Sequence, residues 1–139
     1  MKKFILCAIS LCLMAGIVNG AVEAKEIKVK CRITKYTKDE CPNKHTASGK
    51  IPREGFVALS RDLYKEFNIP YGASVYVEGY KERDRFYAED KVGIKITKKD
   101  KTGKLYNHYL TRTIDIYEEH IQEKRYLNKS TWVTITWEH

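Results

Sequence analysis

The chain has 139 residues, the length of one ordinary domain, and its 26 Lys and Arg outweigh 18 Asp and Glu to give a formal net charge of +8. A hydrophobic content of 42% and an aromatic content of 12% supply a core and exclude general disorder. The composition also excludes collagen-like, low-complexity and coiled-coil proteins.

The first 24 residues have the pattern of a secretory signal peptide. Two lysines precede an apolar stretch at 4–18, and short residues place a cleavage site after Ala24. A single membrane anchor is the alternative, but this stretch is shorter than the ~20 apolar residues that a spanning helix needs. We predict a cleaved signal, which removes two Lys and one Glu. The remaining 25–139 form one secreted, periplasmic or wall-associated domain of net charge +7, without a transmembrane segment.

The predicted mature chain keeps two cysteines, Cys31 and Cys41. An even pair in an exported protein predicts a disulfide, which here closes a short loop. A metal site is the alternative, but with only His45 nearby the pair lacks a fourth ligand. We therefore predict a Cys31–Cys41 disulfide and no metal.

Apolar residues recur mostly with a period of two, which is typical of half-buried strands. The predicted strands are 27–34, 56–59, 74–78, 86–90, 113–117 and 131–137. Six short strands over this length predict an all-β fold, a small closed barrel. Trp132 and Trp137 are an odd number of positions apart, so they should face opposite sides of the last strand.

Three segments depart from the strand pattern. Residues 61–67 predict a short helix with Ser60 as its cap, and 118–124 predict another. The lysine-rich stretch 97–104 predicts a solvated hairpin tip or excursion.

Several short motifs follow one another in a characteristic order. They are Ile33-Thr34-Lys35-Tyr36-Thr37, Thr46-Ala47-Ser48-Gly49, Gly55-Phe56-Val57-Ala58-Leu59, Ile69-Pro70-Tyr71-Gly72, Val75-Tyr76-Val77, Ala88-Glu89-Asp90 and Ile114-Asp115-Ile116-Tyr117. This order resembles the 3D (three-aspartate) domain, a double-psi β-barrel. That domain forms part of membrane-bound lytic transglycosylase A and of several cell-wall-associated secreted proteins of bacteria. The resemblance covers roughly 31–137.

The sequence departs from that family's pattern at three places. Where family members usually have an Asp after the first apolar strand, this chain has Ser60, with Asp62 two residues on. The glycine-rich turn after Asp90 is only partly kept. The next Asp, Asp115, follows after 25 residues, with 97–112 as an insertion.

The resemblance implies action on peptidoglycan without a cofactor. A lytic transglycosylase uses one carboxyl first as acid and then as base on the substrate's own 6-hydroxyl, and the matching residue here is Asp115. Asp90 would lie nearby and raise the pKa of Asp115 by like-charge repulsion. Tyr36, Thr46 and Ser48 would line the groove and bind sugar hydroxyls.

Alternative interpretations remain open. Asp90 could serve only to hold a turn, and residues 46–49 could be no more than a tight turn. His45 suits a surface position, and His108 and Tyr109 suit an edge hairpin better than a reach over the groove. The barrel could also bind wall glycan without cleaving it, or act on a protein partner in the envelope. The net charge favours peptidoglycan or another anionic wall polymer, with no specific role for nucleic acid. It leaves the oligomeric state open.

Overall fold

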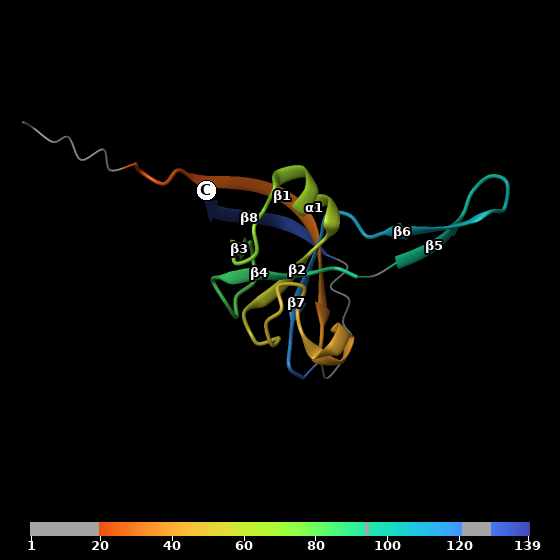
Figure 1. The fold of residues 1–139 in the computed structure, drawn as a ribbon, viewed down its shortest axis with the longest axis horizontal. Helices are drawn as coiled ribbons and strands as arrows, with labels where there is room; N and C mark the ends of the chain where they lie inside the picture. The colour runs from red at the N-terminus through yellow and green to blue at the C-terminus, as the bar shows by residue number, and fades with distance from the viewer. Residues whose placement is uncertain (1–19, 94, 121–128) are drawn as a thin grey trace, which may run out of the picture.

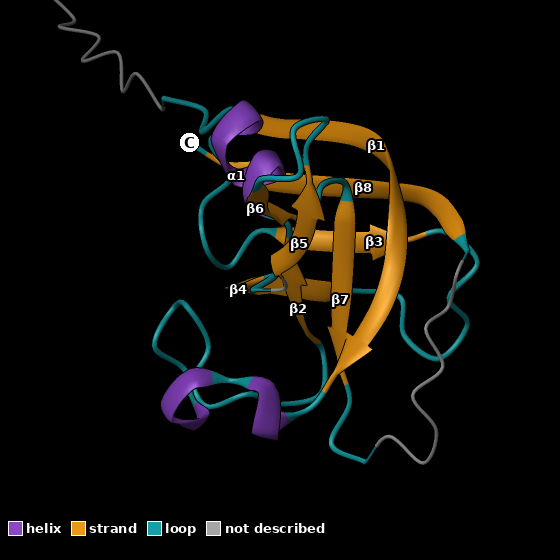
Figure 2. Ribbon diagram, turned by 90° about the vertical axis from the view of Figure 1, so that its right-hand side faces the viewer, coloured by secondary structure: helices purple, strands orange, loops and turns teal. Residues whose placement is uncertain are grey.

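A closed six-stranded β-barrel forms the body of the protein, as predicted (Figure 2). The computed structural model describes residues 20–93, 95–120 and 129–139. The barrel strands are β1 (Ala24–Tyr36), β2 (Phe56–Leu59), β3 (Ser74–Val77), β4 (Phe86–Lys91), β7 (Thr113–Tyr117) and β8 (Ser130–Glu138). They close in the order β1-β7-β2-β4-β3-β8.

The barrel combines parallel and antiparallel pairs. β1 runs parallel to β7, and β2 runs parallel to β4, whereas the other four neighbours are antiparallel. The long strand β1 pairs with β8 along its first part and with β7 from Arg32 to Tyr36. As a result, strands far apart in sequence become direct neighbours.

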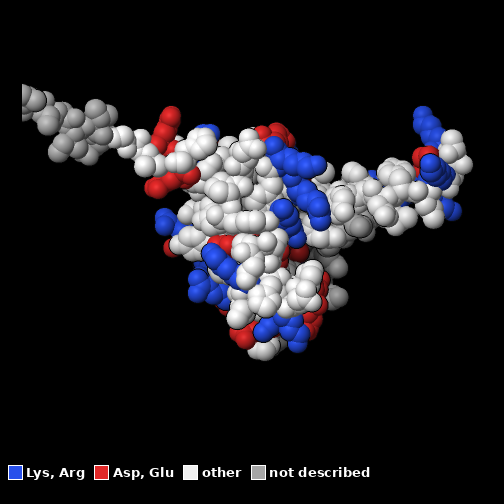
Figure 3. Space-filling model, viewed as in Figure 1, with Lys and Arg blue, Asp and Glu red and all other residues white. Residues whose placement is uncertain are grey.

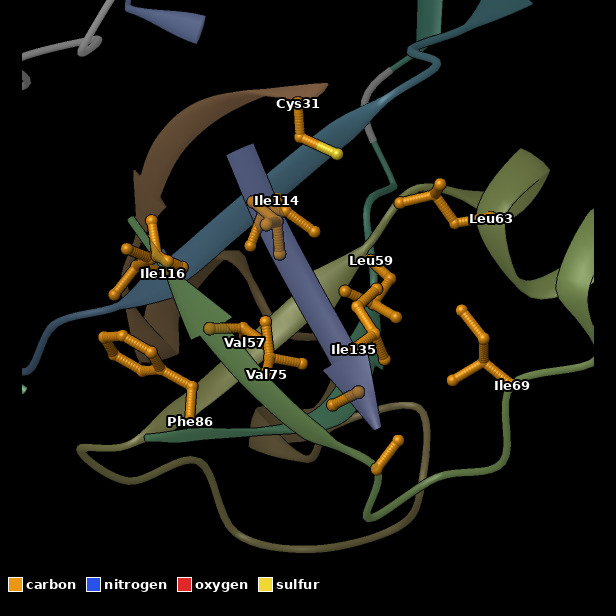
Figure 4. Close-up of a cluster of buried hydrophobic side chains, with 14 of the residues drawn as sticks. Cys31, Val57, Leu59, Leu63, Ile69, Val75, Phe86, Ile114, Ile116 and Ile135 are labelled. Atoms are coloured by element: carbon orange, nitrogen blue, oxygen red, sulfur yellow. The ribbon is translucent and has the colours of Figure 1, made fainter. Parts of the chain in front are cut away.

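Successive residues of each strand point alternately inward and outward, and the inward-facing ones fill the barrel interior (Figure 4). In β2, Val57 and Leu59 point inward, while Phe56 and Ala58 belong to a second cluster on the outer face. In β7, Ile114 and Ile116 are inside, so Asp115 between them faces outward, as predicted.

A loop segment covers this outer face of the barrel wall. It follows β1 and contains two 3₁₀ turns, η1 (Lys38–Glu40) and η2 (Pro42–Lys44). The cluster between the cover and the wall consists of Tyr36, Cys41, Phe56, Ala58, Val92 and Tyr117. The candidate site lies at the edge of this cluster.

The predicted disulfide is wrong, because Cys31 and Cys41 are both buried free thiols. Cys31 packs in the barrel interior beside Ile114 (Figure 4), whereas Cys41 packs in the outer cluster. β1 runs on from Cys31 to Tyr36, past the predicted end at residue 34, and this carries the chain about 17 Å along the barrel at 3.3 Å per residue.

The predicted helix at 61–67 is confirmed as α1 (Arg61–Phe67). Ser60 precedes it but makes no side-chain cap; its Oγ instead accepts the backbone N–H of Thr113 at 3.0 Å. For the predicted helix at 118–124, residues 118–120 are not helical and the remainder lies outside the described residues.

The lysine-rich excursion forms a separate hairpin of β5 (Lys95–Lys99) and β6 (Leu105–Tyr109). It makes a two-stranded sheet of its own and projects away from the barrel (Figure 1). At its tip, Oδ1 of Asp100 accepts the N–H groups of Thr102 and Lys104.

The remaining predictions concern single residues and the chain ends. Trp137 is buried and Trp132 is exposed, which confirms that they face opposite sides. Most of the predicted signal peptide lies outside the described residues, and Ala24 begins β1. Within the part of the chain that the structure describes, no helix has the length and apolarity to cross a bilayer.

Candidate functional site

A β-bulge in β4 aims Asp90 at the outer face of the wall. β4 pairs with β2 through Val57–Ala88 and then Ala58–Asp90, so Glu89 is an extra residue in the ladder. Without this shift, strand alternation would place Glu89 opposite Ala58 and turn Asp90 toward the barrel interior. The bulge therefore decides which acid faces the site.

Asp90 and Asp115 lie in one row across the barrel wall. Ala58 pairs with Asp90 on one side and with Asp115 on the other, and Asp115 in turn pairs with Thr34. Strands lie about 4.8 Å apart, which puts the Cα atoms of the two acids about 10 Å apart. The methyl group of Ala58 leaves the space between the carboxyl groups open.

An open cleft of about 610 Å³ lies over this row. Its floor is formed by Tyr36, Ala58, Asp90 and Asp115. Its rim is formed mainly by the residues Glu40, His45, Thr46, Arg61, Lys91 and Gly93. Both predicted acids therefore share one cleft, although 25 positions separate them in sequence.

Asp115 is 93% buried, and the hydroxyl of Thr34 donates a hydrogen bond to its Oδ1 at 2.9 Å. Its pKa is raised to about 7. Burial is the main cause, the Thr34 hydrogen bond opposes the rise, and the carboxylates of Glu40 and Asp90 add to it. The predicted repulsion from Asp90 has the right direction, but burial is the larger cause. Asp115 can thus hold or release a proton near neutral pH.

Asp90 is tied mainly to the backbone. Its Oδ1 accepts the N–H groups of Ala47 and Lys91, both at 2.8 Å, and its Oδ2 lies 3.7 Å from the Cys41 thiol. The carboxyl group joins the loop after η2 to the end of β4. This geometry matches the turn-holding interpretation of Asp90 and gives Asp115 the larger chemical freedom.

Tyr36 brings a buried hydroxyl to the cleft floor. Burial raises its pKa well above the ordinary value, and the nearby Asp90 carboxylate adds to the effect, so the phenol keeps its proton. Within the described residues the hydroxyl makes no hydrogen bond of normal geometry. The hydroxyl oxygen is shielded from solvent, and the Asp90 carboxylate is the nearby acceptor.

Thr46 and Ser48 mostly bond within their own turn. The Thr46 hydroxyl lies 3.0 Å from that of Ser48 and accepts the N–H of Lys50, while Gly49 donates its N–H to the Thr46 carbonyl. Gly49 has φ of 85°, a conformation that favours glycine. Thr46 lines the cleft, but Ser48 is not among its lining residues.

The rim carries two basic residues, Arg61 and Lys91, that the sequence did not single out. The guanidinium of Arg61 lies 4.3 Å from the ring centre of Tyr109, at the base of the hairpin. Lys91 lies over the rings of Tyr64 and Tyr71. His45 is exposed, as expected, and lines the rim.

Neither residue at the family's remaining acidic position reaches the cleft. Ser60 is fully buried against Thr113, and Asp62 accepts the backbone N–H of Arg112. Thr34 was not predicted as a site residue, and its contact with Asp115 spans 81 positions. Only the parallel pairing of β1 and β7 reveals that contact.

Among the described residues, no group of three or more His, Cys, Asp or Glu side chains is arranged to hold a metal ion. Comparisons with models of protein families, with curated proteins and with solved structures found no match. The family resemblance therefore rests on the motifs of this chain alone.

Proposed function

We propose that the protein is exported and cleaves peptidoglycan strands by a lytic transglycosylase reaction, with Asp115 as the acid and base. One observation carries the proposal: a buried carboxyl with a pKa of about 7 lies on the floor of an open cleft. A general acid works best when its pKa lies near the operating pH.

In this mechanism the protonated Asp115 gives its proton to the glycosidic oxygen as the bond to the anomeric carbon breaks. The resulting carboxylate then takes the proton of the sugar's 6-hydroxyl, whose oxygen attacks the anomeric carbon. The product is a 1,6-anhydro sugar, and Asp115 is protonated again. No water is consumed, so one carboxyl is sufficient.

The other groups on the floor orient the substrate and the acid. The Thr34 hydroxyl holds Oδ1 of Asp115, and the buried Tyr36 hydroxyl donates to a sugar oxygen once a glycan chain reaches the floor. Asp90 keeps the covering loop on the barrel wall. Such positioning supplies much of the rate in reactions of this kind.

The test is a digest of purified sacculi, read by mass spectrometry for anhydro-muropeptides. We expect product from the unaltered protein, none from Asp115→Asn and a reduced amount from Asp90→Asn. Asp84→Asn, an exposed acid between β3 and β4, is the matched control and should leave the yield unchanged. Undiminished product from Asp115→Asn would contradict the assignment.

A non-catalytic glycan-binding module is the second candidate. The two backbone N–H groups on Oδ1 of Asp90 favour it, because they give this acid of the cleft a structural task rather than a chemical one. This function predicts that the protein sediments with sacculi without releasing anhydro products. Tyr36→Phe should then weaken sedimentation, because the variant lacks the buried hydroxyl.

A further inference from the structure

The β5–β6 hairpin begins and ends beside the cleft. The chain leaves the barrel after Val92 and Gly93, which line the cleft, and returns through Arg112 to β7. The hairpin then extends well beyond the barrel (Figure 1). Any long chain that lies in the cleft can therefore continue alongside it.

The base of the hairpin is fixed to α1 by three contacts. Arg61 lies over the ring of Tyr109, the carboxylate of Asp62 accepts the backbone N–H of Arg112, and Glu66 accepts a hydrogen bond of 2.6 Å from the Arg112 guanidinium. Arg61 also lines the cleft. These contacts hold the base of the hairpin in a fixed position next to the rim of the cleft.

The outer half of the hairpin is basic. Its four exposed lysines outnumber a single acid, Asp100, whose carboxylate is occupied by the turn. The lysines are Lys98, Lys99, Lys101 and Lys104. Positive charge gathers at the far end of the projection (Figure 3). Leu105 and Tyr106 beside it are 60% and 47% exposed and offer apolar contact.

From this arrangement we propose that the hairpin is an extension of the cleft that binds the same anionic glycan chain beyond the site. The proposal rests on the proposed function and adds that the substrate is a polymer longer than the cleft. The lysines of the hairpin meet the carboxylates of the peptide stems, and Tyr106 of the hairpin lies against sugar rings. Continuity with the cleft favours a glycan chain over a bilayer surface.

The experiment compares two probes, intact sacculi and a soluble disaccharide–tetrapeptide. The hairpin variant changes its four exposed lysines to Gln. A matched variant removes four exposed positive charges from the barrel: Lys25→Gln, Lys30→Gln, Lys81→Gln and Arg85→Gln. All measurements use the full mature chain.

We expect the hairpin variant to lose at least about tenfold in affinity for sacculi, which corresponds to about 1.4 kcal/mol. Its affinity for the short fragment should stay within about twofold of the unaltered protein, because the fragment fills only the cleft. The barrel variant should lose much less on sacculi. Raising the salt concentration should reduce the difference between the two variants.

Four results would overturn the proposal. Two concern sacculi: an undiminished affinity of the hairpin variant, or an equal loss of affinity in the barrel variant. The third is that the hairpin variant loses as much affinity for the short fragment as for sacculi. The fourth is hairpin-dependent binding to vesicles of phosphatidylglycerol and phosphatidylethanolamine without binding to sacculi. If the unaltered protein binds neither sacculi nor fragment, the proposed function fails and this proposal fails with it. Hairpin-dependent binding without lysis would uphold the extension while rejecting catalysis by Asp115.

Discussion

Asp90 and Asp115 lie two strands apart in one cross-strand row, with the methyl group of Ala58 between them. Their surroundings nevertheless differ. Asp90 is held by two backbone N–H groups, whereas Asp115 has the Thr34 hydroxyl and a buried setting. Two similar residues in one cleft therefore have different chemistry, and the difference can be measured.

Asp115 should make folding stability fall as pH rises. In the folded chain Asp115 has a pKa of about 7, whereas an Asp in the unfolded chain has a pKa of about 3.9. Stability from this group is present below about pH 4 and is lost by about pH 7, with an upper limit of about 4 kcal/mol. Asp115→Asn should therefore be more stable than the unaltered protein at about pH 8.

Urea unfolding at about pH 5 and about pH 8 measures this difference. Asp84→Asn, which alters an exposed acid, should show the pH dependence of the unaltered protein. If Asp115→Asn kept that same dependence, the raised pKa would be wrong.

Removal of the Thr34 hydroxyl should move the titration of Asp115 upward. The hydrogen bond from Thr34 lowers the pKa of Asp115, so Thr34→Val should raise it above about 7. Carbon-detected NMR of the labelled carboxyl group measures the pKa without any assay of activity. Thr131→Val, a change in a hydroxyl that bonds the Glu78 carbonyl, is the control and should leave the Asp115 titration in place. A downward shift in Thr34→Val would contradict the geometry.

Cys31 and Cys41 should remain reduced and unreactive in the folded protein. Burial raises the pKa of each thiol to about 12, so little thiolate is present at neutral pH. We expect iodoacetamide to modify neither residue in the native state and both residues in urea, as read by peptide mass spectrometry. A peptide pair joined through these cysteines in oxidised protein would restore the disulfide prediction.

The stability of the fold should depend on the ion pair between the buried Glu89 and the exposed Lys50. Lys50 lies 2.6 Å from one oxygen of Glu89, and the other oxygen is buried without a hydrogen bond in the described structure. Lys50→Met should destabilise the fold by about 1–2 kcal/mol, because it leaves the buried Glu89 carboxylate without its partner. The loss is no larger because Lys50 is more than half exposed and solvent screens the pair.

A double-mutant cycle with Glu89→Gln measures the coupling, and the double variant should recover most of the loss. Lys81→Met, at an exposed lysine, should change stability by less than about 0.5 kcal/mol. If the effects of Lys50→Met and Glu89→Gln on stability were additive, the ion pair would contribute nothing to stability.

The sequence alone determined the six barrel strands, α1 and a solvated excursion at 97–104. These features depend on local alternation, turn residues and charge, which the chain displays residue by residue. The pattern of 113–117 also placed Asp115 on the face opposite its two isoleucines, as the structure confirms. Such predictions succeed because a side chain's direction within one strand follows from backbone geometry.

The tertiary structure decided everything that depends on which strands become neighbours. The extra residue Glu89 turns Asp90 toward the cleft, and the parallel pairing of β1 with β7 brings Thr34 to Asp115. The length of β1 likewise separates Cys31 from Cys41, which we had predicted to be bonded because they are an even pair in an exported chain. Register, bulges and barrel closure arise from long-range hydrogen bonding and packing, so no local pattern in this chain could reveal them.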